Sequence, residues 1–191
     1  MKIDSIYDGL TEFCRKKKSK WIIYFISFIE SIFFPLPTDP FLVPYIIATK
    51  KFINLSLWVT IYSVVGGAVA YFLGSFFWTQ LEPILEVSYP QITLYIQEFK
   101  NEYFNLGIII ILIGGFSPFP YKVTCIASGI IGINFILFIV FSFLSRGLRF
   151  FLVSYLIFKY GEKSVDYIRK NIFVVSCILL LLGIIFYFIK F

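Results

Sequence analysis

Residues 55–79 contain no Asp, Glu, Lys or Arg, and this run most constrains the fold. An apolar stretch of about 20 residues is long enough to cross the hydrocarbon core of a bilayer as a helix. Residues 135–158 and 172–190 are two further apolar runs. Of the whole chain, 59% is hydrophobic and 15% charged, against about 25% charged in a soluble domain. We therefore expect an all-α integral membrane protein.

A shorter apolar segment, residues 21–34, is interrupted by Glu30. As a helix it would reach only about 21 Å, which is less than the roughly 30 Å of the hydrocarbon core. It meets three prolines within six residues, Pro35, Pro37 and Pro40, and then continues as a second short piece at 41–49. Because proline breaks the helical hydrogen-bond ladder, we expect a re-entrant hairpin over 21–49. One long, kinked spanning helix is the alternative.

The same pattern returns 83 residues later. Residues 104–117 and 123–133 are short apolar pieces on either side of Pro118 and Pro120. Phe33-Phe34-Pro35-Leu36-Pro37 aligns with Phe116-Ser117-Pro118-Phe119-Pro120. The chain is therefore predicted to repeat a hairpin (21–49, 104–133) followed by a spanning helix (55–79, 135–158). A loop at 80–103 with a surface helix at 91–104 joins the copies, an amphipathic segment at 1–20 precedes them, and an additional C-terminal spanning helix at 172–190 follows.

The net charge of +6 comes from basic clusters that border the apolar runs, at residues 15–20, 50–51 and 159–170. Lys and Arg are enriched on the cytoplasmic side of membrane proteins. With a cytoplasmic N-terminus, all three clusters fall on that side and the acidic 80–103 segment falls outside. This distribution argues against nucleic-acid binding. A single span between the copies also makes the two repeats inverted, which is the architecture of many secondary transporters.

Five charged residues fall within or beside the apolar segments: Glu30, Asp39, Lys122, Arg146 and Arg149. Each costs roughly 2.5–3.5 kcal/mol at the centre of a bilayer, so such residues are functional candidates. Asp39 and Lys122 occupy equivalent positions in the two copies, where an ion pair would be structural or a gate. Helix capping is the alternative for Asp39, and a hydrogen bond to another helix is the alternative to proton transfer for Glu30.

Arg146 and Arg149 are three residues apart and so share one helix face. Together with Lys122 they form a cluster suited to a phosphate, because guanidinium groups bind phosphate oxygens in a bidentate way. Snorkelling towards the headgroups is the alternative. The chain has no histidine, and its three cysteines lie far apart. This composition predicts no metal site and no cofactor, and it disfavours a histidine-dependent lipid phosphatase.

Three motifs resemble those of the DedA (VTT-domain, SNARE-associated Golgi protein) membrane proteins, closest to their YqaA-like branch. They are Glu30-Ser31-x-Phe33-Phe34-Pro35-x-Pro37-x-Asp39, Gly115-Phe116-x-Pro118-x-Pro120-Tyr121-Lys122, and Arg146-Gly147-x-Arg149-Phe150. The resemblance covers residues 20–160 and implies two facing re-entrant hairpins. It also implies that Glu30 and Asp39 are the essential acids, and that Lys122, Arg146 and Arg149 are the basic residues.

By this resemblance we expect a non-enzymatic lipid transporter or flippase in a bacterial cytoplasmic membrane, which moves an anionic lipid such as a polyprenyl phosphate. Proton coupling through Glu30 and Asp39 is left open, as is assembly into a homo-oligomer. The alternatives are a passive phospholipid scramblase, which needs a polar groove but no coupling acid, and a non-catalytic membrane scaffold. The scaffold predicts that neutralising the buried charges leaves function intact.

Overall fold

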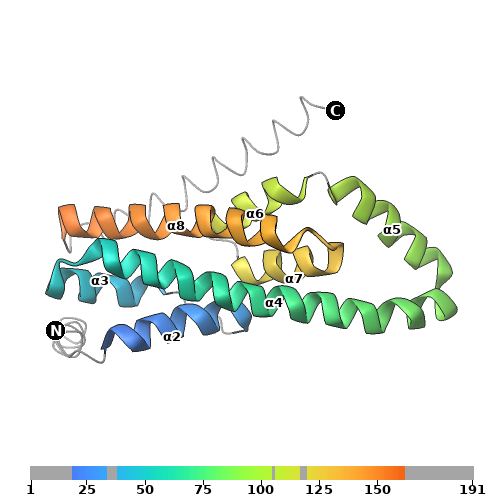
Figure 1. The fold of residues 1–191 in the computed structure, drawn as a ribbon, viewed down its shortest axis with the longest axis horizontal. Helices are drawn as coiled ribbons and strands as arrows, with labels where there is room; N and C mark the ends of the chain where they lie inside the picture. Colours follow the sequence, from blue (N-terminus) through green and yellow to red (C-terminus); the bar gives the residue numbers. More distant parts are fainter. Residues whose placement is uncertain (1–18, 34–37, 105, 117–119, 162–191) are drawn as a thin grey trace, which may run out of the picture.

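The computed structural model describes residues 19–33, 38–104, 106–116 and 120–161, and these residues are almost entirely helical with no β-strand among them (Figure 1). The helices are α2 (Ser19–Ile32), α3 (Asp39–Thr49), α4 (Phe52–Ser88), α5 (Pro90–Phe104), α6 (Gly107–Phe116), α7 (Tyr121–Ile131) and α8 (Phe135–Tyr160). The expected all-α class is therefore confirmed. The segment 1–18, the span expected at 172–190, and Pro35, Pro37 and Pro118 lie outside the described residues.

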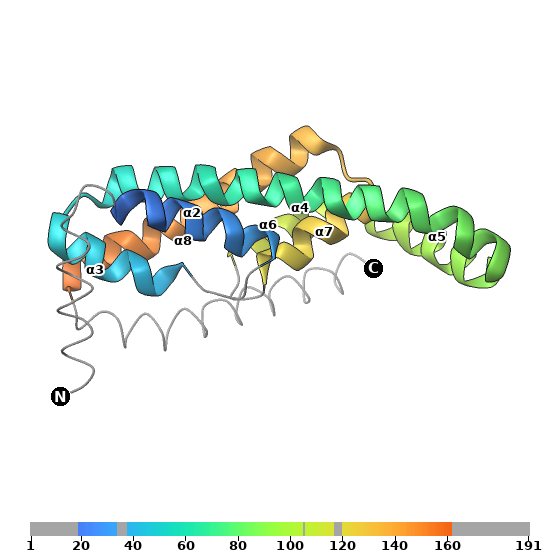
Figure 2. The same cartoon turned by 90° about the horizontal axis from the view of Figure 1, so that it is seen from below.

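Two helices, α4 and α8, are long and apolar enough to cross a membrane, judged by length and composition within the described residues. They run side by side in opposite directions and form the axis of the molecule (Figures 1 and 2). Asn134 starts α8 as its N-cap, since its side chain accepts hydrogen bonds from Ile136 N at 2.9 Å and Leu137 N at 3.3 Å. Such a cap satisfies backbone donors that the first turn leaves free.

Two pairs of short helices flank this axis. In the first pair, α2 and α3 run antiparallel beside one half of α4 and α8; in the second pair, α6 and α7 do the same beside the other half (Figures 1 and 2). The second helix of each pair ends in a left-handed residue, Lys50 (φ 55°) in α3 and Gly132 (φ 82°) in α7. A left-handed residue is a common helix terminator because it turns the chain while its N–H bonds back to the last turn.

The starts of the long helices, and of the second helix in each short pair, follow the spacing of the sequence repeat. Helix α8 begins 83 residues after α4, and α7 begins 82 residues after α3. The predicted helical pieces at 41–49, 55–79 and 135–158 each fall within a single helix, and the piece at 123–133 falls on α7 except for its last two residues.

The connection between the copies differs from the predicted loop at 80–103. Helix α4 continues to Ser88, and α5 begins at Pro90 and folds back along the end of α4 (Figure 1). The predicted loop is therefore wrong over 80–88, and only Tyr89 separates the two helices. Residues 80–88 consist mainly of good helix formers, including Gln80, Leu81 and Glu86, and even Pro83 is accommodated within the helix.

The buried apolar residues form two separate clusters, one under each helix pair. The first includes Leu42, Val59 and Phe150, and the second includes Tyr71, Cys125 and Phe138. On both long helices, buried polar side chains occupy the positions between the clusters, with Thr60 and Ser63 on α4 and Ser142, Ser145 and Arg146 on α8. The core is thus two apolar halves separated by a polar layer.

Candidate functional site

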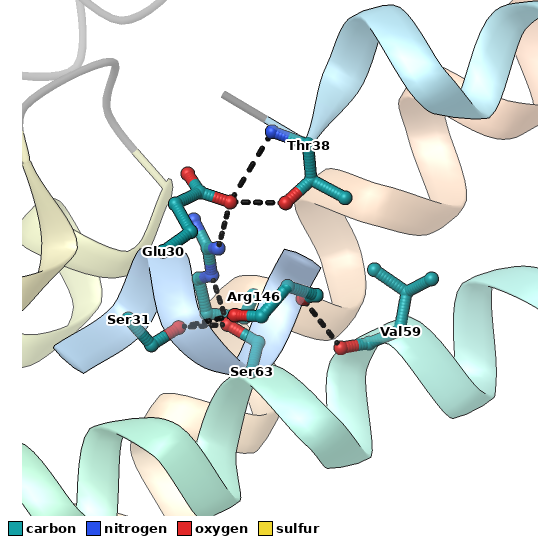
Figure 3. Close-up of polar contacts among 7 residues, drawn as sticks. Glu30, Ser31, Thr38, Val59, Ser63 and Arg146 are labelled. Carbon is teal, nitrogen blue, oxygen red and sulfur yellow. Dashed lines mark hydrogen bonds and ion pairs between the residues drawn. The ribbon is translucent and has the colours of Figure 1, made fainter. Parts of the chain in front are cut away.

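Arg146 lies at the centre of this polar layer and is 1% exposed. Its Nε donates to the Ser63 hydroxyl at 2.9 Å, and its Nη2 lies 3.7 Å from the Glu30 carboxylate (Figure 3). The rings of Tyr121 and Phe150 lie 4.8 Å and 4.5 Å from its Cζ. A buried guanidinium is tolerated only when charge and hydrogen-bond partners compensate its desolvation, and these contacts supply both.

Glu30 is the partner that joins the most elements. It lies on α2, and its side chain is 21% exposed. Besides Arg146, one of its oxygens accepts hydrogen bonds from the backbone N of Thr38 at 3.3 Å and from the Thr38 hydroxyl (Figure 3). Thr38 is the N-cap residue of α3. The Glu30 carboxylate therefore reaches across the break between α2 and α3, to a helix start whose partial positive charge favours an anion.

This contact revises the reading of Asp39 as a helix cap. Helix α3 begins at Asp39, so Thr38 precedes it as the N-cap, and Thr38 makes its contacts with Glu30 instead of capping its own helix. The side chain of Asp39 lies outside the described residues. Its pairing with Lys122 stays a prediction.

Lys122 connects the two helix pairs. It is the second residue of α7, and its Nζ donates to the backbone carbonyl of Phe33, directly after the end of α2, at 3.1 Å. A cation is favoured there because the last carbonyls of a helix carry partial negative charge. The start of α7 and the end of α2 therefore meet near the middle of the molecule, one helix turn from Glu30.

The remaining predicted residues surround this centre. Arg149 lies one turn beyond Arg146 on α8 and is half-buried. A side chain at Gly115 would collide with Ser145, and its Cβ would lie 3.6 Å from the Arg146 Cγ. Gly115 thus lets α6 pack directly against the polar layer. Pro120 immediately precedes α7.

Hydroxyl groups complete the site: the motifs contain Ser31 without a role for it, and they do not contain Ser27 or Ser63. Ser31 and Ser63 lie 2.9 Å apart between α2 and α4, and Ser27 donates to the carbonyl of Val59 at 3.0 Å (Figure 3). A signal was present in the sequence. Serine and threonine recur every three or four residues within apolar helices, at 27 and 31, at 56, 60 and 63, and at 142 and 145. That spacing indicates one helix face.

The described residues contain no group of three or more acidic, cysteine or histidine side chains that could hold a metal ion. The chemistry that the site offers is ionic. It holds a partly exposed carboxylate, a buried guanidinium that the carboxylate neutralises, and a lysine at the junction of the helix pairs.

Two relatives align with nearly the whole chain. An uncharacterized protein of Haemophilus influenzae is 31% identical over 97% of this chain and 96% of its own length. A second uncharacterized protein, from Histophilus somni, is 30% identical with the same coverage. This chain belongs to their family. No protein-family model matches the sequence. No solved structure matches it either.

Proposed function

We propose that the chain is an integral membrane protein of the DedA type, that each pair of short helices is a re-entrant hairpin, and that it moves an anionic lipid across a bacterial cytoplasmic membrane. The exposed apolar surface supports membrane integration. Large apolar side chains face outward along both long helices: Leu57, Val65, Phe72 and Phe76 on α4, and Ile136, Phe143, Phe151 and Tyr155 on α8. Lipid chains would cover this surface, whereas exposing so many apolar side chains to water is unfavourable.

The repeat supports the inverted arrangement. The starts of α3 and α7 and of α4 and α8 recur at an offset of 82 or 83, α4 and α8 run in opposite directions, and the two helix pairs approach each other from opposite ends (Figure 1). Ser63 and Arg146, which bond to each other, are themselves 83 residues apart. Contact between equivalent residues is expected where a pseudo-twofold axis passes between two copies. A membrane site at a repeat interface is common among secondary transporters.

The observation that carries the proposed function is the pair between Glu30 and the buried Arg146 at this interface. A charge is rarely kept at such a position without a use. Arg146 is already neutralised, so a lipid phosphate reaching it must displace Glu30. In this mechanism, phosphate and carboxylate compete for the guanidinium, and Lys122 provides further positive charge at the junction. A displaced carboxylate can take up a proton, which would link proton movement to lipid movement.

Transport by the purified protein in liposomes tests this function. Labelled polyprenyl phosphate should cross faster than a zwitterionic phospholipid, and a pH gradient should accelerate it. Glu30→Gln should remove the acceleration completely, because glutamine cannot exchange a proton at this position. Asp39→Asn should do the same if Asp39 is a coupling acid, and it should leave the acceleration unchanged if Asp39 has no part in coupling.

The other outcomes identify the competing functions. Equal movement of both lipids, without sensitivity to the gradient or to Glu30→Gln, would indicate a passive scramblase. No lipid movement above that of empty liposomes, together with full biological activity of the Glu30 and Arg146 variants in cells, would indicate a scaffold.

The proposed topology predicts which sites an impermeant thiol reagent reaches in intact cells. With the native cysteines replaced by alanine, Glu98→Cys on the exposed face of α5 should react from outside, and Lys51→Cys only after permeabilisation. Leu36→Cys and Phe119→Cys, at the proline breaks, should react poorly from either side. Free reaction of the residue 36 thiol from outside, at the rate of the residue 98 thiol, would contradict the re-entrant hairpin.

A further inference from the structure

The direction of each hydrogen bond around Arg146 can be assigned by counting protons. A serine hydroxyl donates only one hydrogen. The Ser31 hydroxyl donates to the carbonyl of Ser27 at 3.0 Å, so in its 2.9 Å contact with Ser63 it must be the acceptor. Ser63 therefore donates to Ser31 and accepts from Arg146 Nε at 2.9 Å. The result is a directed chain from Arg146 through Ser63 and Ser31 to the backbone of α2.

This chain is sealed from water. Arg146, Ser63, Ser31 and Ser27 are each at most 1% exposed. Away from solvent, hydrogen bonds are stronger and polarise one another along a chain. The Ser63 hydroxyl also has no spare donor with which to bond elsewhere. It therefore presents a fixed acceptor to the guanidinium.

We infer that Ser63, supported by Ser31, is a positioning residue that orients the Arg146 guanidinium towards Glu30. Binding Nε at Ser63 fixes one edge of the planar guanidinium, and its terminal Nη2 then lies 3.7 Å from the carboxylate. Without this anchor the group keeps its charge but loses a defined direction. If the chain moves an anionic lipid as proposed, this orientation of the guanidinium sets how strongly Glu30 competes with the lipid headgroup for Arg146.

If Ser63 and Ser31 served only to hold α2 against α4, other buried bonds between these helices would matter equally. Ser27 lies on the same helix as Ser31 and joins the same two helices, α2 and α4, through its 3.0 Å bond to the Val59 carbonyl. Its hydroxyl donates to Val59, and the hydrogen-bond chain from Arg146 ends on the Ser27 backbone carbonyl, which alanine retains. Ser27→Ala is thus a matched control that removes a buried bond between α2 and α4 without disturbing Arg146.

Hydrogen exchange at the arginine Nε, measured by NMR on the full chain with labelled arginine in nanodiscs, tests the inference. The chain has four arginines, and Arg146→Lys assigns the signal. In the unsubstituted protein, the Arg146 Nε–H should exchange most slowly of the four. Ser63→Ala should speed this exchange at least about tenfold, the factor expected for loss of a hydrogen bond to a charged group. Ser63→Thr and Ser27→Ala should leave it slow.

Unchanged exchange in Ser63→Ala, or fast exchange in the unsubstituted protein, would overturn the inference. So would equally fast exchange in Ser63→Thr and Ser63→Ala, because the hydroxyl would then not be responsible. If Ser63→Ala does not fold, Ser31→Ala decides, since loss of the acceptor behind Ser63 should speed exchange by a smaller factor. Unchanged hydrogen exchange in Ser31→Ala would then contradict the hydrogen-bond chain through Ser63 and Ser31.

The liposome assay separates this inference from the proposed function. Ser63→Ala should slow transport of labelled polyprenyl phosphate at least about tenfold, with Ser27→Ala unaffected. Suppose that Ser63→Ala exchanges faster but still transports lipid at the full rate, while Arg146→Lys transports none. The orientation of the guanidinium is then not used in transport. If the unsubstituted protein and Arg146→Lys both move no lipid, the proposed function fails, and the exchange result alone decides whether Ser63 positions Arg146.

Discussion

Replacing Glu30 by glutamine is expected to lower the free energy of unfolding by about 3 kcal/mol or more, because it leaves a buried arginine without its counter-ion. Arg146 is 1% exposed, so water cannot take over the role of the carboxylate. The change also weakens the acceptor at the start of α3, where Thr38 bonds to Glu30. Denaturant unfolding in detergent measures the loss. Glu86→Gln, at an exposed position of α4, is the control and should change stability by less than about 0.5 kcal/mol.

The double variant Glu30→Gln/Arg146→Met sharpens this prediction. The double variant removes both charges and puts an apolar side chain of similar length in place of the arginine, so no buried charge is left without a partner. The double variant should therefore be more stable than Glu30→Gln alone. Losses that simply add would mean that Glu30 and Arg146 do not depend on each other.

Alanine at Gly74 or Gly129 is expected to cost about 1–3 kcal/mol, and more if the helices cannot separate. These glycines form a reciprocal contact between α4 and α7. A Cβ at Gly74 would collide with the carbonyl of Ile126, and one at Gly129 with the carbonyl of Tyr71. Backbone atoms cannot rotate away as a side chain can. Thermal unfolding of the purified variants measures the effect.

Gly147 provides the matched control for this contact. It also lies in a long helix, but a Cβ there would meet only the side chain of Thr60, with the methyl group at 3.5 Å and the hydroxyl oxygen at 4.0 Å, which are ordinary contact distances. Gly147→Ala should stabilise the protein by up to about 1 kcal/mol, because alanine favours the helix. Equal losses at Gly74 and Gly147 would mean that helix packing is not the cause.

Much of the helix arrangement was predictable because proline and hydrophobicity act locally. The apolar runs located α4 and α8, and the proline motifs located the breaks between the short helices. The end of α4 was not predictable in this way. Bilayer thickness suggested a helix that stops near residue 79, but thickness limits only the apolar part of a helix. The polar residues that follow are good helix formers and continue the helix to Ser88.

The charged residues of the site were predicted, but the contact between Glu30 and Arg146 was not. The repeat made Asp39 and Lys122 equivalent, and this equivalence suggested that they pair. The described contacts join Glu30 to Arg146 and Lys122 to the Phe33 carbonyl, while the pair between Asp39 and Lys122 stays a prediction. Equivalence in a repeat does not say which faces turn towards each other. The helix rotation depends on small residues such as Gly66, where a Cβ would collide with the Phe28 carbonyl.

The helices of each short pair pack mainly on different long helices: α2 and α7 on α4, and α3 and α6 on α8. This has a consequence for biosynthesis. Helix α3 is complete at Thr49, but the helix on which it packs ends only at Tyr160, about 110 residues later. At ordinary rates of translation, this interval lasts on the order of ten seconds. During this time α2 can pack on α4, but the surface of α3 that packs on α8 stays uncovered until α8 has been synthesised.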